Sequence, residues 1–192
     1  EGILTPGRIG AKDGEAGVIV TERVGLGLAS LEVRNGQTDA LKSCVRNAYG
    51  AALPEGPTVV SGKDVMFIGT GPGQWLAVSE AHRNEDLAAH LAAKLEGRAS
   101  VADQSSGRGA LRLSGPRARD CLARGLAIDL DPRVFPAGSA ATSTLSHMGA
   151  ALWREGEAEH FDIVLNRSMA DSLWRWLKAS AAEYGCQVVT AS

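Results

Sequence analysis

The residue types most often used for catalysis and metal binding are present, but their spacing does not form a site. A helical metal site needs two histidines four residues apart, and no pair of the four histidines has that spacing: His82, His90, His147 and His160. A nucleophilic serine typically lies in a Gly-x-Ser-x-Gly turn, and none of the candidate serines does: Ser79, Ser105, Ser106 and Ser146. The sequence therefore predicts neither a metal site nor a catalytic nucleophile.

Two glycine-rich segments begin like phosphate-binding loops. Residues 25–30 lack the third glycine of a dinucleotide fingerprint, and they continue into the alternating run Leu31-Glu32-Val33, which is typical of a strand. Residues 69–73 lack the Lys-Ser/Thr end of a P-loop, and Pro72 removes one backbone donor. We therefore expect a strand and a tight turn at these positions, and no cofactor bound by this chain.

Composition and charge exclude several other classes of protein. The 192 residues are 44% hydrophobic and 22% charged, which is typical of a globular protein. With 20 basic and 22 acidic residues, the chain has no electrostatic reason to bind nucleic acid. Without a signal peptide or an apolar run near the ~20 residues that span a bilayer, we expect no membrane association and a cytoplasmic location. The cysteines fit neither a disulfide framework nor a zinc site, and we interpret them as buried hydrophobic residues: Cys44, Cys121 and Cys186.

Short strands and a few helices must position these residues. Runs of apolar and β-branched residues predict strands at 18–22, 26–33, 58–60, 65–69, 74–78, 110–113, 143–147, 150–154 and 161–165. Helical periodicity and stop signals predict helices at 38–49, 85–95, 116–124 and 168–184. The first dozen residues show neither period, so we expect an irregular arm over residues 1–14.

The order of these elements matches between the two halves of the chain. Two pairs of segments correspond: Leu31–Ala52 with Leu111–Ile128, and Trp75–Val78 and its helix with Phe161–Leu165 and Ser168–Tyr184. We infer a duplicated β-α-β-β-α unit in one domain, 15–192, built from halves 15–98 and 99–192. The fold class is α+β, with antiparallel sheets that are covered by helices on one side.

The last predicted helix offers a candidate for a protein interface. Its apolar arc comprises Met169, Leu173, Trp176, Leu177 and Tyr184. Trp174 falls at the edge of this arc, where it either covers the core or anchors a partner protein. The N-terminal arm is the second interface candidate, because its apolar residues Ile3, Leu4 and Ile9 are costly to leave in water.

Four segments together resemble a known family. They are Gly71–Val78, Asp103–Ser105 followed by Leu111–Pro116, Asp129–Pro136, and Leu152–Arg154 through Arg167–Trp174. In this order and spacing they make nearly the whole chain similar to the gamma subunit of heterotetrameric sarcosine oxidase. The fold of that family resembles the N-terminal region of the folate-binding T-protein of the glycine cleavage system.

The resemblance implies a noncatalytic subunit that assembles with alpha, beta and delta subunits. In the family, the alpha chain holds NAD and the tetrahydrofolate site, and the beta chain holds FAD and a covalent FMN. The complex oxidises sarcosine to glycine and reduces oxygen to hydrogen peroxide. The one-carbon unit passes to tetrahydrofolate or is released as formaldehyde.

One departure from the T-protein pattern concerns the acidic pair that aminomethyltransferases carry. By the resemblance, this pair falls at Met148-Gly149, and neither residue can exchange a proton. An acid from elsewhere, Asp103 or Asp162 for example, remains open. The alternative to a noncatalytic subunit is therefore a stand-alone folate-binding protein of the aminomethyltransferase type.

Overall fold

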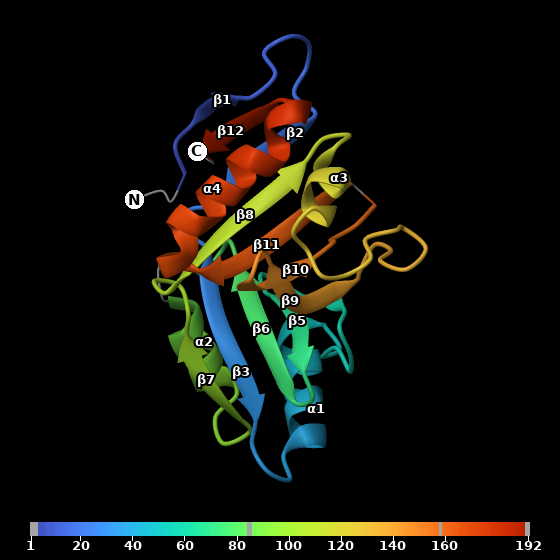
Figure 1. Ribbon diagram of the computed structural model, residues 1–192. Helices are drawn as coiled ribbons and strands as arrows, with labels where there is room; N and C mark the ends of the chain where they lie inside the picture. The colour runs from blue at the N-terminus through green and yellow to red at the C-terminus, as the bar shows by residue number, and fades with distance from the viewer. Residues whose placement is uncertain (1–3, 84–85, 158, 191–192) are drawn as a thin grey trace. The chain divides into compact units, whose positions relative to one another are not determined.

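The computed structural model describes residues 4–83, 86–157 and 159–190. These residues form two compact units (Figure 1). The central unit is Gly25–Ser106, and the terminal unit combines the chain before it with the chain from Gly107 onward. The predicted division of one domain, 15–192, into halves 15–98 and 99–192 stays a prediction.

The central unit is a five-stranded antiparallel sheet in the order β4-β5-β6-β3-β7. Its elements along the chain are β3 (Gly27–Val33), α1 (Thr38–Tyr49), β4 (Val59–Ser61), β5 (Met66–Gly71), β6 (Gln74–Ser79), α2 (Asp86–Lys94) and β7 (Ala99–Asp103). The start predicted for the second helix, residue 85, lies outside the described residues. The predicted turn between β5 and β6 is confirmed, and Gly73 supplies its positive φ of 68°.

Both helices of the central unit cover the same face of its sheet. Their buried stripes recur every four residues, at Leu41, Val45 and Tyr49 and at Leu87, Leu91 and Leu95. They pack on alternate strand residues such as Leu31, Phe67 and Trp75, so the residues between these point to the opposite face, which we call the far face of the central sheet. Gly50 ends α1 with a φ of 67° and donates its N–H to the Arg46 carbonyl.

The terminal unit is a seven-stranded sheet in the order β1-β12-β2-β8-β11-β10-β9. Its elements are β1 (Gly7–Ile9), β2 (Val18–Glu22), β8 (Arg108–Ser114), α3 (Ala118–Ala123), β9 (Ala140–Leu145), β10 (Met148–Trp153), β11 (His160–Asn166), α4 (Ala170–Ala181) and β12 (Cys186–Thr190). Short 3-10 turns, η1 (Arg167–Met169) and η2 (Ala182–Tyr184), flank α4. Both α3 and α4 pack on one face of this sheet, through residues such as Leu122, Leu173 and Leu177.

The α+β class and the duplicated order of elements are confirmed. The series β3-α1-β4-β5-β6-α2-β7 matches β8-α3-β9-β10-β11-α4-β12. Each repeat is longer than the expected β-α-β-β-α, because three strands separate the helices and a further strand, β7 or β12, closes the repeat. The terminal sheet is also mixed rather than purely antiparallel, since β12 pairs in parallel with β2.

The N-terminal arm is more ordered than expected. Residues 7–9 form the edge strand β1, which pairs antiparallel with β12. Its register places Gly7 opposite Val188 and Ile9 opposite Cys186. The strand has too few residues to show a period of its own, and its pairing partner lies at the other end of the chain.

Candidate functional site

A row of cross-strand neighbours marks the face of the terminal sheet that α3 and α4 leave uncovered. Trp153 on β10 pairs with Asp162 on β11, Asp162 pairs with Arg112 on β8, and Arg112 pairs with Thr21 on β2. The adjoining strand residues, such as Leu111 and Phe161, belong to the core on the helix side. Because side chains alternate along a strand, the row lies on the opposite face.

Asp162 is the centre of this cluster, and its side chain is only 1% exposed. Arg112 donates from Nε to Oδ1 at 2.9 Å and from Nη2 to Oδ2 at 2.8 Å. Arg23 donates from Nη1 to Oδ1 at 3.1 Å. Two guanidinium groups therefore cover both oxygens of one buried carboxylate, which is the geometry of a charge-assisted structural ion pair.

His160 lies two residues from Asp162 on the same strand face. Its Nε2 atom is 3.7 Å from Asp162 Oδ2, and it is buried without a hydrogen bond to any described residue. Burial and the Arg112 guanidinium lower the pKa of His160, and the carboxylates of Asp162 and Glu155 oppose this shift only in part. The cluster thus joins a carboxylate to a neutral imidazole, but both carboxylate oxygens already accept hydrogen bonds from arginine.

From the sequence, Asp162 was one possible replacement for the missing acidic pair. Nothing in the sequence predicted that two arginines would pair with it. Arg112 lies within Leu111-Arg112-Leu113, and Asp162 lies within Phe161-Asp162-Ile163. A single charge between buried residues of a strand indicates a side chain on the face opposite the core. That signal was available in both strands, although pairing the two charges required the register.

The other acidic position considered, Asp103, is the last residue of β7, and its side chain binds the segment that follows the strand. Its Oδ1 accepts the backbone N–H of Ser105 at 3.1 Å and the Ser105 hydroxyl at 2.7 Å, just after the end of β7. Met148 is buried in the core of the terminal unit, and Gly149 is exposed. Of the two positions matched to the acidic pair, the first therefore holds an apolar side chain, and the second holds a glycine, which has no side chain.

The first glycine-rich segment forms a strand, as the sequence predicts. Residues 27–33 are β3, and Gly27 is required because a Cβ there would lie 1.8 Å from the backbone oxygen of His82. The glycine therefore allows a close approach of two backbone segments within the central unit, rather than of a phosphate. Within the described ranges, no group of three or more His, Cys, Asp or Glu side chains could hold a metal ion.

The interface candidates occupy different environments. Trp174 is half-buried against the core, and Lys178 Nζ lies 5.4 Å from the centre of its ring. Leu4 is buried in the core of the terminal unit, and its N–H donates to Glu22 Oε2. Ile9 is half-buried on β1, and Ile3 lies outside the described residues. A role in an interface stays a prediction for all four.

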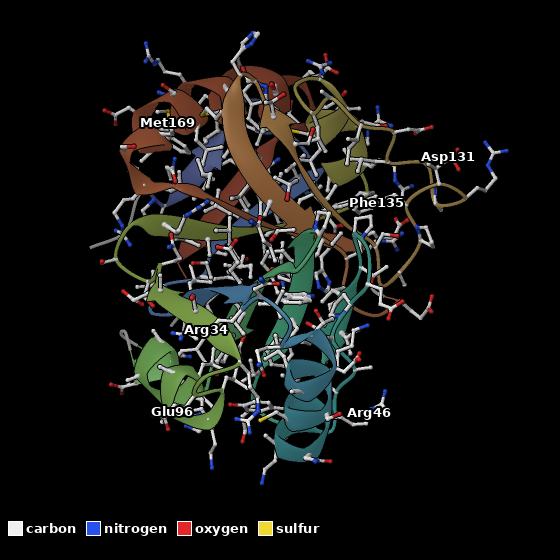
Figure 2. All side chains as sticks on the ribbon, turned by 90° about the horizontal axis from the view of Figure 1, so that it is seen from below. Arg34, Arg46, Glu96, Asp131, Phe135 and Met169 are labelled. Carbon is white, nitrogen blue, oxygen red and sulfur yellow. The ribbon has the colours of Figure 1, made fainter. Side chains whose placement is uncertain are left out.

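Met169 departs from the apolar arc predicted for the last helix. It lies on η1, before α4 begins (Figure 2), and the residue is 39% exposed. Trp176 packs against Gly125, where a Cβ would lie 2.5 Å from the indole nitrogen. Met169 is therefore an exposed member of the predicted arc, whereas Leu173 and Leu177 are buried.

The two buried cysteines should react slowly with thiol reagents. Burial is the main reason that the pKa of Cys121 rises to about 12 and that of Cys186 to about 11. Cys44 is half-buried, and its Sγ contacts the carbonyl of Lys94. In a thiol-titration assay of the folded chain, we expect Cys44 to react first and the other two only on unfolding. Modification of Cys121 as fast as of Cys44 would contradict this placement.

A stacked histidine pair in the central unit should make stability depend on pH. The rings of His82 and His90 lie 4.2 Å apart, and Tyr49 meets His90 edge-on. Burial, then His82 and Lys94, lower the pKa of His90, and only Asp64 opposes them. The unfolded chain therefore binds more protons, and stability should fall as the pH drops from about 7 through the folded pKa.

Urea unfolding at a series of pH values measures this effect. His90→Gln should weaken the dependence on pH, whereas His147→Asn, in an exposed turn, should leave it unchanged. The same pH dependence in His90→Gln and in the natural chain would contradict the prediction.

None of the helices in the described ranges is long and apolar enough to cross a membrane.

Comparison with known proteins connects this fold to one family. Residues 34–183 match the SoxG family, described as the sarcosine oxidase gamma subunit family. The chain is 33% identical to a sarcosine oxidase subunit gamma of Corynebacterium sp. (strain P-1), over 77% of this chain and 72% of the relative. It is 30% identical to that of an Arthrobacter species, over 93% of this chain and 88% of the relative.

Solved structures give the same result. The chain is similar to a chain of heterotetrameric sarcosine oxidase from Corynebacterium sp. U-96 in complex with pyrrole 2-carboxylate, with a TM-score of 0.77, 27% identity, and coverage of 92% of this chain and 88% of that one. The aminomethyltransferase T of the Bartonella henselae glycine cleavage system shares the fold, with a TM-score of 0.60, 17% identity, and coverage of 91% of this chain and 48% of that one. The family match over most of the sequence and the agreement in fold show that this chain belongs to the sarcosine oxidase gamma subunit family.

Proposed function

We propose that this chain is a noncatalytic subunit of a heterotetrameric sarcosine oxidase. The observation that carries the proposal is the similarity over 92% of the chain to part of a sarcosine oxidase described as heterotetrameric. In this account the chain contributes packing surface and assembles with alpha, beta and delta subunits. Its location in the cytoplasm is part of the same proposal.

The chemistry is assigned to the other subunits. By the family resemblance, the alpha and beta subunits hold FAD, FMN, NAD and tetrahydrofolate. The complex oxidises sarcosine to glycine, transfers the one-carbon unit to tetrahydrofolate or releases formaldehyde, and reduces oxygen to hydrogen peroxide. This chain's own residues support the division, because both oxygens of Asp162 accept hydrogen bonds from arginine and the position matched to an acidic pair holds Met148 and Gly149.

The absorption spectrum of the purified chain, produced without other subunits, tests the noncatalytic assignment. We expect no flavin band and no oxidation of sarcosine. Titration with a tetrahydrofolate analogue distinguishes this proposal from the alternative, since binding at micromolar concentration would favour a stand-alone aminomethyltransferase-like protein. A flavin band, sarcosine oxidation or tight folate binding by the lone chain would overturn the assignment.

Trp174 remains the candidate anchor for a partner subunit, and we expect Trp174→Ala to weaken co-purification with the other subunits. Truncation of a buried aromatic anchor typically costs about 2 kcal/mol or more of binding. Asp171→Ala, at an exposed position of the same helix, is the matched control. Unchanged assembly of Trp174→Ala would remove Trp174 from the interface.

The role of the N-terminal arm is better tested by a single substitution than by deletion of the arm. Removal of residues 1–12 would also remove β1 and the buried Leu4, and would therefore disturb the terminal unit itself. Ile9→Ser leaves Leu4 in place, and reduced co-purification of this variant would support contact between the arm and a partner. Assembly as strong as that of the natural chain would contradict it.

A further inference from the structure

One edge of the central sheet, strand β7, lies beside a hollow. The hollow has a volume of about 310 Å³, and residues of β3, β5, β6 and β7 line it. Glu32, Gln74 and Ser100 are neighbours in register across β6, β3 and β7. Their side chains lie on the far face of the central sheet, because the adjoining residues Leu31 and Trp75 pack under the helices.

The polar groups of this hollow are open to a ligand. Glu32, Gln74 and Ser100 are all exposed, and within the described part of the chain their side chains make no hydrogen bond or ion pair. Glu32 is the one charged residue among the described lining residues. A carboxylate, an amide and a hydroxyl thus line the same space, and all three groups can accept hydrogen bonds.

This set of acceptors matches a cationic side chain. A guanidinium presents five N–H donors in a planar fork, which suits a carboxylate together with neighbouring oxygens. Elsewhere on this chain, two exposed glutamates pair with arginine, Glu183 with Arg124 and Glu159 with Arg119. The charge and size of the hollow therefore fit an arginine or lysine that reaches it from outside the chain.

The strand that bounds the hollow is also a free sheet edge. β7 ends the strand order and pairs only with β3 in the described sheet. Its five residues, Ala-Ser-Val-Ala-Asp, include neither the lysine nor the proline that commonly protect an edge. Figure 1 shows β7 at the margin of the sheet. Such an edge can accept an extended segment from another chain.

The hydrogen-bond register shows which groups of β7 are available. Gln104 donates its N–H to the Leu28 carbonyl, so residues 100 and 102 also face β3, because the pairing alternates. The backbone groups of Val101 and Asp103 therefore point to the open side. The N–H of Ala99 follows the same pattern, since it turns away from β3 to the Leu95 carbonyl.

We propose that the β7 edge and the adjoining hollow form a docking surface for another subunit of the oxidase, which pairs with Val101 and Asp103 and places an arginine or lysine against Glu32. The proposal rests on the proposed function, which supplies the partner. Charge complementarity at Glu32 selects the occupant, and the outward-facing backbone groups of Val101 and Asp103 fix the direction from which it approaches.

Charge reversal at Glu32 tests the surface in the assembled complex. Glu32→Arg places like charges together, and we expect it to weaken binding to the other subunits by roughly tenfold or more. Glu96→Arg, at another exposed glutamate of the central unit, is the matched control and should change binding by less than roughly twofold. Glu32→Gln keeps the shape and should give an intermediate loss.

Hydrogen exchange of the backbone amides tests the docking surface without any substitution. On assembly, the amides of Val101 and Asp103 should exchange roughly tenfold or more slowly than in the free chain. Unchanged exchange at both amides, or equal binding by Glu32→Arg and Glu96→Arg, would overturn the docking surface. Self-association of the free chain that slows the same amides would assign the surface to a second copy and also overturn the proposal.

The two proposals fail in different ways. If the natural chain does not associate with the other subunits, the proposed function is wrong. If it associates and the results at Glu32 and β7 are negative, only the docking surface is wrong.

Discussion

Replacement of Asp162 by alanine is expected to lower the free energy of unfolding by about 3 kcal/mol or more. Removal of one partner of a buried ion pair typically costs about 3–5 kcal/mol, because the remaining charges lose their compensation. Here the loss leaves Arg23, whose side chain is 10% exposed, and Arg112, which is 32% exposed. Since water reaches Arg112, we expect the lower end of this range.

Two further variants identify the cause of the loss. Asp162→Asn keeps the shape and removes the charge, so it should destabilise the chain nearly as much as alanine does. Asp131→Asn breaks an exposed pair with Arg133, and it should leave the urea midpoint nearly unchanged although Arg133 lowers the pKa of Asp131 to about 2. A tolerated Asp162→Asn would contradict the ion-pair account.

Trp153→Ala should be equally damaging, at about 3–5 kcal/mol. Trp153 is 0% exposed and is among the largest fully buried side chains. Its Nε1 atom is buried without a partner among the described residues, so Trp153→Phe removes an uncompensated donor and should cost less than half as much. Trp174→Ala, at a half-buried position, should cost about 1–2 kcal/mol.

Thermal or urea unfolding of these variants checks the ranking. Equal losses for Trp153→Ala and Trp174→Ala would show that Trp174 belongs to the core, and it would then lose its role as a candidate anchor. A small loss for Trp153→Ala would contradict its burial.

The sequence identified the elements that carry a strong local signal. The helix at 38–49 has a clear apolar stripe and a stop at Gly50, and the structure places α1 at the same residues. The strands that pair at the centre of each sheet, such as β3 and β8, have alternating or continuous apolar residues, and both were predicted within a few residues. Hydrophobic periodicity was sufficient to predict an element when the spacing of apolar residues within its own sequence shows which of its faces is buried.

Three strands were missed: β12 (Cys186–Thr190) contains three β-branched residues, whereas β7 and β1 depend on distant pairing. β7 contains one β-branched residue, Val101, and forms a strand because it pairs with β3. β1 forms a strand of three residues against β12, which lies near the other end of the chain. Propensity within such short segments is weaker than the tertiary pairing that orders them.

The contacts of the candidate site also depend on distant strand pairing, which the sequence did not predict. Single charges within the strands of Arg112 and Asp162 were visible in the sequence, but their contact follows from an antiparallel register of strands about fifty residues apart. The interface candidates came from composition, and the structure separates them, because Leu4 contributes to this chain's own core whereas Trp174 stays half-buried.

Affinity purification of the tagged chain, co-expressed with the other oxidase subunits of its source, tests the central claim most directly. The quantity measured is the sarcosine-dependent oxygen consumption that the tag retains, together with the subunit ratio. The account predicts that the tagged chain retains flavin-containing partners in fixed proportion and that this fraction oxidises sarcosine, whereas the lone chain does not. Recovery of the tagged chain free of partners and of activity would contradict it.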